Sequence, residues 1–196
     1  MTNPSGDING RQHFNRWSAT YERSFMQWLL FARVHQGVLA RVPASFTPTE
    51  ILDIGCGTGR LLRRMQARWP AACLRGVDPA EGMVAQARAQ TPGIQIDQAP
   101  AESLPLEAGL VDLVTSTTSF HHWTDQAQGV REAARVLHQG GLFVLADMAL
   151  PWAGRPLSPH QVRAMFEAAG LTIQSQTSPV LFFTFTVGQK PDRSLM

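Results

Sequence analysis

Three alternate glycines in this chain stand where a bound ligand could approach the backbone. They are Gly55, Gly57 and Gly59, which follow a short apolar run containing Asp53 and precede a segment with helical spacing. Glycine permits a sharp turn with no Cβ in a ligand's way, and the free N–H groups at a helix start attract nucleotide-like groups. A second acid, Asp78, closes the next apolar run 19 residues after Gly59, where a carboxylate can accept both hydroxyl hydrogens of a ribose. The spacing therefore predicts a nucleotide-like ligand at this turn.

The segments that would position these residues alternate between strand-like and helix-like patterns. Apolar runs predict strands at 50–55, 73–78, 94–98, 111–116, 141–147, 171–177 and 180–188. Helical spacing and boundary signals predict helices at 11–42, 59–69, 80–90, 124–138 and 158–169. Only Ser178 and Pro179 join the last two strands, and so short a connection allows only an antiparallel hairpin. We therefore expect an α/β fold with a mostly parallel sheet.

The composition narrows the class of protein. A chain of 196 residues suits one structural domain, and 17 basic against 15 acidic residues give little reason to expect a polyanionic partner. Arginines 60, 63, 64 and 68 lie at helical spacing, which suits a solvated helix face better than a nucleic-acid stripe. Cys56 and Cys73 form neither a disulfide framework nor a metal-binding spacing. With no leader pattern and no apolar run of bilayer length, we expect a soluble cytoplasmic protein without a membrane partner.

The pattern Asp53-x-Gly55-x-Gly57-x-Gly59 resembles motif I of the class I S-adenosylmethionine (SAM) dependent methyltransferases. In that family an acid at Asp53 helps to hold the positive amino group of SAM's methionine part, whereas dinucleotide dehydrogenases normally have an apolar residue there. Such a partner would offset the desolvation of a buried carboxylate, although N–H groups of the turn itself are an alternative partner. The resemblance covers roughly residues 13 to 191. It implies a Rossmann-like, mostly parallel seven-stranded sheet with a C-terminal antiparallel hairpin, and SAM as the cofactor.

The resemblance also indicates which residues surround the cofactor. The loop 98–106 (QAPAESLPL) is similar to the family's G-D-A-E-x-L-P-F segment, but Pro100 replaces the acid that accepts a hydrogen bond from the adenine amino group. We therefore expect adenine to be held by backbone near Ala101, by Glu102, and by apolar packing from Pro79 and Met83. The full set of expected cofactor contacts is Asp53, Gly55, Cys56, Gly57, Gly59, Asp78, Pro79, Met83, Ala101, Glu102, Ser116 and Tyr21.

The segment after the fourth expected strand would face the methyl acceptor. Residues 111–122 resemble the family's D-V-V-x-S-x-x-x-x-H-H pattern, which makes His121 or His122 a candidate general base for a hydroxyl or thiol. We favour His121, and the alternative is that the pair only opens a helix. Methyl transfer from a sulfonium mainly requires alignment and exclusion of water, so no metal site is expected. The slot lacks the Asn/Asp-Pro-Pro-aromatic motif of base-directed enzymes, which disfavours nucleic acid as acceptor.

The N-terminal segment resembles a lid. Residues 13–22 are similar to the F-x-x-x-A-x-x-Y lead-in of small-molecule methyltransferases related to those of ubiquinone and menaquinone biosynthesis, where it closes over the cofactor. We therefore divide the chain into a helical lid segment, 1–45, and a SAM-binding domain, 46–191, within one structural domain overall. Tyr21 would touch the cofactor or close the pocket, and packing on the domain edge is the alternative. Trp123, Trp152 and a second subunit are further sources of the acceptor pocket, in a monomer or homodimer.

The sequence thus favours a SAM-dependent methyltransferase that acts on a small molecule by in-line displacement. Two alternatives remain at this point. One is a SAM-binding, methyltransferase-like protein that regulates or scaffolds without turnover, which the replaced acid at Pro100 supports. The other is an NAD(P) oxidoreductase, which Asp53 and the C-terminal hairpin oppose.

Overall fold

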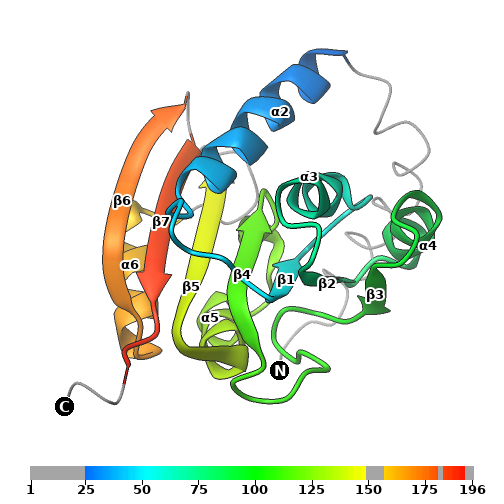
Figure 1. The fold of residues 1–196 in the computed structure, drawn as a ribbon. Helices are drawn as coiled ribbons and strands as arrows, with labels where there is room; N and C mark the ends of the chain where they lie inside the picture. Colours follow the sequence, from blue (N-terminus) through cyan, green and yellow to red (C-terminus); the bar gives the residue numbers. More distant parts are fainter. Residues whose placement is uncertain (1–24, 149–156, 181–182, 193–196) are drawn as a thin grey trace, which may run out of the picture.

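The computed structural model describes residues 25–148, 157–180 and 183–192, with side chains at 31–148, 157–178 and 183–192. The described residues form a seven-stranded sheet in the order β3-β2-β1-β4-β5-β7-β6 (Figure 1). The strands are β1 Glu50–Ile54, β2 Cys73–Asp78, β3 Gln95–Gln98, β4 Val111–Thr117, β5 Leu137–Met148, β6 Thr172–Val180 and β7 Phe183–Gln189. The helices are α2 Phe25–Ala40, α3 Arg60–Arg68, α4 Glu81–Gln90, α5 Gln126–Val136 and α6 Pro159–Ala168, with a 3-10 turn, η2, at Phe120–His122.

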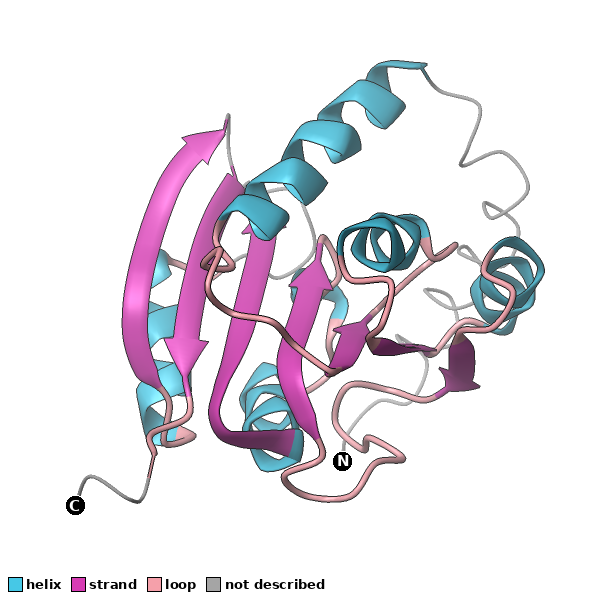
Figure 2. Ribbon diagram, in the orientation of Figure 1, coloured by secondary structure: helices cyan, strands magenta, loops and turns pink. Residues whose placement is uncertain are grey.

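Helices cover both faces of this sheet, as a parallel sheet requires. Figures 1 and 2 show α2, α3 and α4 on one face and α5 and α6 on the other. Successive strand residues point to opposite faces, so Ile51 belongs to the core beneath α2 and α3 whereas its neighbour Leu52 belongs to the core beneath α5. Both side chains are fully buried. The expected Rossmann-like fold is confirmed.

The strand order fixes where a ligand can bind. β1 pairs in parallel with β2 on one side and with β4 on the other, and the order along the sheet reverses between β1 and β4. In an open α/β sheet the crevice for a ligand lies outside the carboxyl ends of the strands at such a reversal. The glycine turn follows β1 and the histidine pair follows β4, so the fold brings these two segments together at that crevice.

The C-terminal hairpin is present, but its turn differs from the expected one. β7 pairs antiparallel with both β5 and β6. β6 runs through Ser178 and Pro179 to Val180, so these two residues lie within the strand and not at its end. The register shifts between Thr177 and Val180. A proline removes a ladder donor, and an edge strand such as β6 tolerates one at a bulge.

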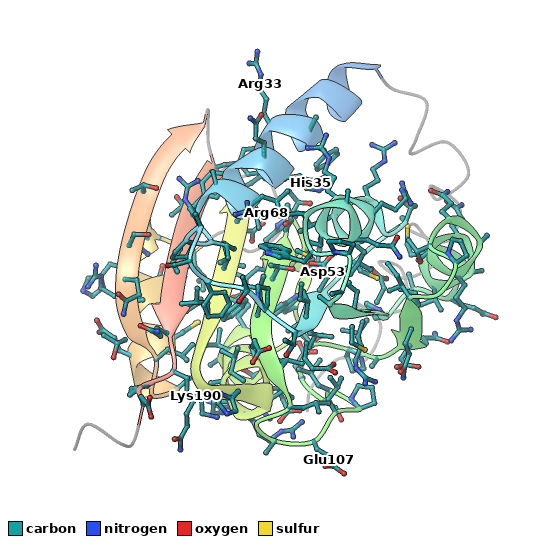
Figure 3. All side chains as sticks on the ribbon, in the orientation of Figure 1. Arg33, His35, Asp53, Arg68, Glu107 and Lys190 are labelled. Atoms are coloured by element: carbon teal, nitrogen blue, oxygen red, sulfur yellow. The ribbon has the colours of Figure 1, made fainter. Side chains whose placement is uncertain are left out.

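The helix before β5 is shorter than the sequence predicted. Helix α5 ends at Val136 and β5 begins at Leu137, so the expected strand start at residue 141 is wrong. The Nζ of Lys190 donates to the carbonyl oxygens of Ala134 at 2.8 Å and Leu137 at 2.7 Å. A cation at this position satisfies the last carbonyls of a helix, so a residue distant in sequence sets the end of α5. Figure 3 shows Lys190 at the amino end of the sheet, far from the crevice.

The arginines of α3 lie on a partly exposed face, as expected, and two of them also donate to backbone carbonyls. Arg64 donates to the carbonyl of Ala32 at 3.0 Å, and Arg68 donates to that of Leu39 at 2.7 Å. Both carbonyls belong to α2, so these side chains tie α3 to α2, and Figure 3 places Arg68 beside the end of that helix.

Among the described helices, none combines the length and the apolar character needed to cross a bilayer.

Candidate functional site

The three glycines of the turn have different jobs. All have positive φ, with values of 70°, 53° and 76° at Gly55, Gly57 and Gly59. A Cβ at Gly55 would lie 2.2 Å from Ser119 Oγ, and one at Gly59 would lie 2.7 Å from Thr91 Cγ2. At Gly57 a Cβ would meet no atom within 4 Å. Two of the glycines are therefore required by packing within the chain, and only Gly57 borders open space that a ligand could enter.

Asp78 closes the turn from the end of β2. Its Oδ2 accepts a hydrogen bond from Gly57 N and its Oδ1 accepts one from Ala80 N, both at 2.9 Å. Burial raises the pKa of Asp78, and these two backbone hydrogen bonds oppose the rise. Each carboxylate oxygen can accept a second hydrogen bond. Asp78 therefore stands beside the open side of Gly57 with capacity left for the hydroxyl groups of a ribose.

Asp53 is a buried carboxylate with no cationic partner among the described residues. It is 2% exposed, and Thr115 Oγ1 donates to its Oδ1 at 2.7 Å. The turn does not supply its partner, because the N–H groups of Gly55 and Cys56 both donate to the carbonyl of Val77. Burial raises the pKa of Asp53 to about 7, the Thr115 hydrogen bond opposes this, and the negative charge of Asp78 adds to it. An ammonium group beside Asp53 would favour its ionised form, so the residue fits the amino group of an amino acid.

The residues expected to hold an adenine ring differ in exposure and in partners. Pro79 is exposed and Met83 is 3% exposed but belongs to neither core cluster. Ala101 is buried, and the carboxylate of Glu102 accepts a hydrogen bond from Asp125 N at 3.0 Å. The Glu102 carboxylate thus holds the start of α5. Pro100 is exposed in the same loop.

Cys56 lies inside the turn and is chemically quiet. It is 7% exposed, and burial raises the pKa of its thiol well above the ordinary value, with the charges of Asp78 and Asp53 adding to the rise. A thiol of this kind is not a nucleophile at neutral pH. Its place in the turn is a matter of packing, because a Cβ on Gly76 would meet Cys56 Sγ at 2.9 Å.

Ser119, which no sequence pattern singled out, fastens the loop after β4 to the glycine turn. Ser119 Oγ lies 2.9 Å from Ser116 Oγ, donates to the carbonyl of Ile54 at 3.2 Å, and accepts from Trp123 Nε1 at 3.1 Å. Ser116 is fully buried, so its hydroxyl supports Ser119 from below. The network holds Trp123 and the histidine pair close to the end of β1.

His121 forms a buried pair with Asp147, which precedes Met148, the last residue of β5. Nδ1 of His121 and Oδ1 of Asp147 are 2.7 Å apart, and the side chains are 3% and 11% exposed. A carboxylate at Nδ1 fixes the ring and leaves Nε2 to take a proton, as a general base requires. The sequence did not single out Asp147, although an acid at the end of an apolar run is also the signal that identified Asp78. His122 lies beside His121, with ring centroids 3.9 Å apart.

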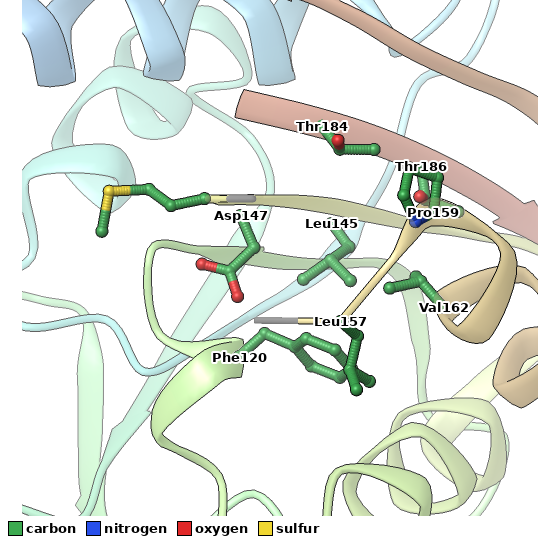
Figure 4. A pocket seen from close by; sticks show the side chains of 9 residues that line it. Phe120, Leu145, Asp147, Leu157, Pro159, Val162, Thr184 and Thr186 are labelled. Carbon is green, nitrogen blue, oxygen red and sulfur yellow. The ribbon is translucent and has the colours of Figure 1, made fainter. Parts of the chain in front are cut away.

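Asp147 also lines a pocket at the carboxyl end of β5. The pocket is small and partly open to solvent, and it encloses about 20 Å³, space for about one water molecule (Figure 4). Its wall is mainly apolar, with a carboxylate and two threonine hydroxyls. The lining residues are Phe120, Leu145, Asp147, Met148, Leu157, Pro159, Val162, Thr184 and Thr186. The lining is chemically suited to an apolar group, although the enclosed space is smaller than a ligand pocket.

Some expected site residues lie outside the described residues, namely Tyr21, the remainder of the 13–22 segment, and Trp152. Among the described residues there is no group of three or more side chains that could hold a metal ion.

Known proteins share this sequence pattern. A family model described as "Methyltransferase domain" matches residues 52–145. The chain is 38% identical over 144 residues to the malonyl-[acyl-carrier protein] O-methyltransferase of Geobacter sulfurreducens, which covers 69% of this chain and 51% of that protein. It is 35% identical over 123 residues to the trans-aconitate 2-methyltransferase of Methylobacterium nodulans, covering 61% and 47%. The chain spans about half the length of these curated relatives.

Solved structures share the fold. A putative methyltransferase crystallised with the Haloferax volcanii Trm112 methyltransferase activator superimposes with a TM-score of 0.78 at 23% identity, covering 91% of this chain and 97% of that one. A SAM-dependent methyltransferase from Thermotoga maritima gives a TM-score of 0.74 at 21% identity, covering 90% and 98%. At these identities the likeness concerns the fold alone.

Proposed function

We propose that this chain, which belongs to the class I SAM-dependent methyltransferase family, transfers the methyl group of SAM to a small-molecule acceptor. One observation carries the proposal. Asp53 is buried without a cationic partner among the described residues, and it precedes by four residues Gly57, where a Cβ would meet no atom. SAM has an ammonium group that can pair with Asp53 and a ribose that can bind Asp78. A dinucleotide has riboses but no ammonium group for Asp53.

The residues of the chain would bind the cofactor in three places. Asp53 would hold the ammonium group, and Asp78 would accept from the ribose hydroxyls while its bonds to Gly57 N and Ala80 N keep the turn closed. Adenine would lie against Pro79 and Met83, with backbone groups near Ala101 in place of the acid that Pro100 replaces. Bound SAM supplies an electrophilic methyl group on a sulfonium, so the protein has to align an acceptor and exclude water.

The acceptor would bind at the ends of β4 and β5. The pocket beside Asp147 offers an apolar wall to the body of the acceptor, and His121 would take the proton that a hydroxyl or thiol loses on methylation. Asp147 accepts from Nδ1 and so holds Nε2 in place for that proton. We further propose that the N-terminal segment 1–45 forms a lid in which α2 is the fixed base on the sheet and Tyr21, ahead of it, lies against the cofactor.

The cell setting is also a proposal. The two cysteines are free thiols, which suits a reducing compartment, and we infer that the enzyme acts in the cytoplasm. Arginines of α3 that could have formed a nucleic-acid stripe donate to the backbone of α2, which supports a small molecule as the acceptor. We propose a monomer or homodimer.

Two measurements test the proposed function. Calorimetric titration should show binding of S-adenosylhomocysteine (SAH), the product form of the cofactor, at micromolar dissociation constants. Incubation of the protein and SAM with metabolite extracts should then yield masses raised by one methylene in mass spectrometry. Binding of NADH in place of SAH would overturn the proposal. SAH binding with no methylated product from broad extracts would favour a binding protein without turnover.

A further inference from the structure

A buried hydroxyl at the end of β4 has no use within the chain. Thr117 is 8% exposed, and its Oγ1 is buried with no hydrogen-bond partner. Two other side-chain atoms in the described ranges share this state, Glu50 Oε2 and Arg75 Nε. Those two belong to an ion pair, since Arg75 Nε lies 3.6 Å from Glu50 Oε2. Of these three atoms, only Thr117 Oγ1 has no oppositely charged neighbour. Its burial without a hydrogen bond does not stabilise the fold.

The backbone around this hydroxyl is held in an unfavourable conformation. Thr118 has a φ of 54°, the only positive φ of a non-glycine residue in the described ranges. Its Oγ1 donates to the carbonyl of Thr117 at 2.7 Å, and its N–H donates to the carbonyl of Ala146 at 2.9 Å. A β-branched residue pays for this region of φ, and strain of this kind is commonly found where a chain presents a group to a ligand. The two hydrogen bonds fix the corner and so fix where Thr117 points.

Strand geometry places the hydroxyl on the face that carries Asp53. Side chains two residues apart on a strand share a face, so Thr117 lies on the same face as Thr115, which bonds Asp53. Asp53 is opposite Thr115 in the register of β1 and β4. β1 ends at Ile54, so Thr117 extends beyond it, at the level where the chain turns through Gly55. The buried hydroxyl therefore lies on the sheet face that carries Asp53, past the end of β1.

We propose that Thr117 Oγ1 hydrogen-bonds the amino-acid end of the bound cofactor and shares that end with Asp53. The inference rests on the proposed function. The hydroxyl can accept from the ammonium or donate to the carboxylate, and either bond involves a charged group, which makes it stronger than a bond between neutral groups. Thr117 would therefore favour ligands that carry an amino-acid group over adenosine compounds that lack one.

Two ligands and three variants test this inference by calorimetry. SAH has the amino-acid end, whereas 5′-methylthioadenosine keeps the adenosine and thioether and lacks it, so the second is measured directly or by competition against SAH. Thr117→Val keeps the shape and removes the hydroxyl, and Thr117→Ser keeps the hydroxyl. Thr91→Val is the matched control, because Thr91 is 1% exposed and its hydroxyl donates to the carbonyl of Ala87 at 2.7 Å.

The expected pattern separates a ligand contact from a structural role. Thr117→Val should weaken SAH about tenfold and leave 5′-methylthioadenosine within about twofold, while Thr117→Ser should stay within about twofold for both. The melting temperature of ligand-free Thr117→Val should equal or exceed that of the parent, since an unpaired buried hydroxyl is lost. Thr91→Val should show the reverse, a lower melting temperature and unchanged SAH binding.

Unchanged SAH binding in Thr117→Val would overturn the inference. So would equal losses for both ligands together with a lower melting temperature, because the hydroxyl would then serve the fold. If the parent protein itself bound no SAH, the proposed function would fail first, and this outcome is distinct from either result with the variant.

Discussion

The two halves of the crevice are held together in different ways. At the ends of β1 and β2 backbone groups do most of the binding, since Asp78 accepts from Gly57 N and Ala80 N, and Gly55 N donates to the carbonyl of Val77. At the ends of β4 and β5 side chains bind side chains, as in the pair of His121 and Asp147. Backbone groups are present whatever the residue types, whereas a pair of side chains needs both partners. The cofactor half is thus fixed by chain geometry, and the acceptor half can change its chemistry by substitution.

Gly55 of one half packs against Ser119 of the other, and the largest expected effect comes from disrupting this contact. Gly55→Ala would put a Cβ 2.2 Å from Ser119 Oγ at a φ of 70°. Left-handed strain and overpacking together should lower the free energy of unfolding by about 2–5 kcal/mol. Chemical denaturation monitored by circular dichroism measures this loss.

A double variant separates the two causes of the lost stability, steric overlap with Ser119 and backbone strain at Gly55. Ser119→Gly removes the steric clash but also loses the three hydrogen bonds of Ser119, so the double variant is compared with Ser119→Gly alone. In that background Gly55→Ala should cost only the strain. Gly57→Ala is the matched control, because its Cβ would meet nothing and only strain of about 1–2 kcal/mol is expected. Equal losses for Gly55→Ala and Gly57→Ala would show that the halves are not coupled through Ser119.

The second prediction concerns the acid that the cofactor half keeps without a cation. The pKa of Asp53 is raised to about 7 in the folded chain, against an ordinary value of 3.8. The folded state therefore holds the proton more tightly, so the free energy of unfolding should fall as pH rises from about 4 to about 7, and Asp53→Asn should remove this slope. Urea denaturation across this pH range measures the effect.

Binding should show the opposite dependence on pH. An ammonium prefers the ionised carboxylate, so SAH affinity should rise as Asp53 ionises toward pH 7. Asp53→Asn should weaken SAH about 10- to 100-fold and flatten this rise, because a hydrogen bond between charged groups is lost. Thr91→Val again serves as the control. A flat pH profile in the parent protein would mean that Asp53 does not face the ammonium group.

The sequence could predict the cofactor half because its signals are local. Gly57 and Asp78 belong to short patterns in which strand, turn and acid follow one another. The contact between Gly55 and Ser119 joins residues 64 positions apart, and neither residue type reveals it. The end of α5 is likewise set by Lys190, more than 50 residues downstream, so the boundary was misplaced. Periodicity identifies elements and faces, whereas contacts that depend on how distant loops fold over each other are beyond its reach.

The smallest effect is expected in the acceptor half, from a change that keeps the shape of a side chain. Asp147→Asn preserves volume but removes the charge that accepts from His121 Nδ1 at 2.7 Å. With an acceptor identified by mass spectrometry, kcat should fall about tenfold, because loss of such a supporting partner misorients the base it holds. KM and SAH affinity should change little, and Asp147→Glu should restore part of kcat. The control is His138→Ala, because His138 is exposed near the start of β5, away from the site. This variant should leave kcat unchanged. If Asp147→Asn lowered SAH affinity as strongly as Asp53→Asn, His121 and Asp147 would contribute to cofactor binding. The ends of β4 and β5 would then belong to the cofactor half, and the proposed division would be wrong.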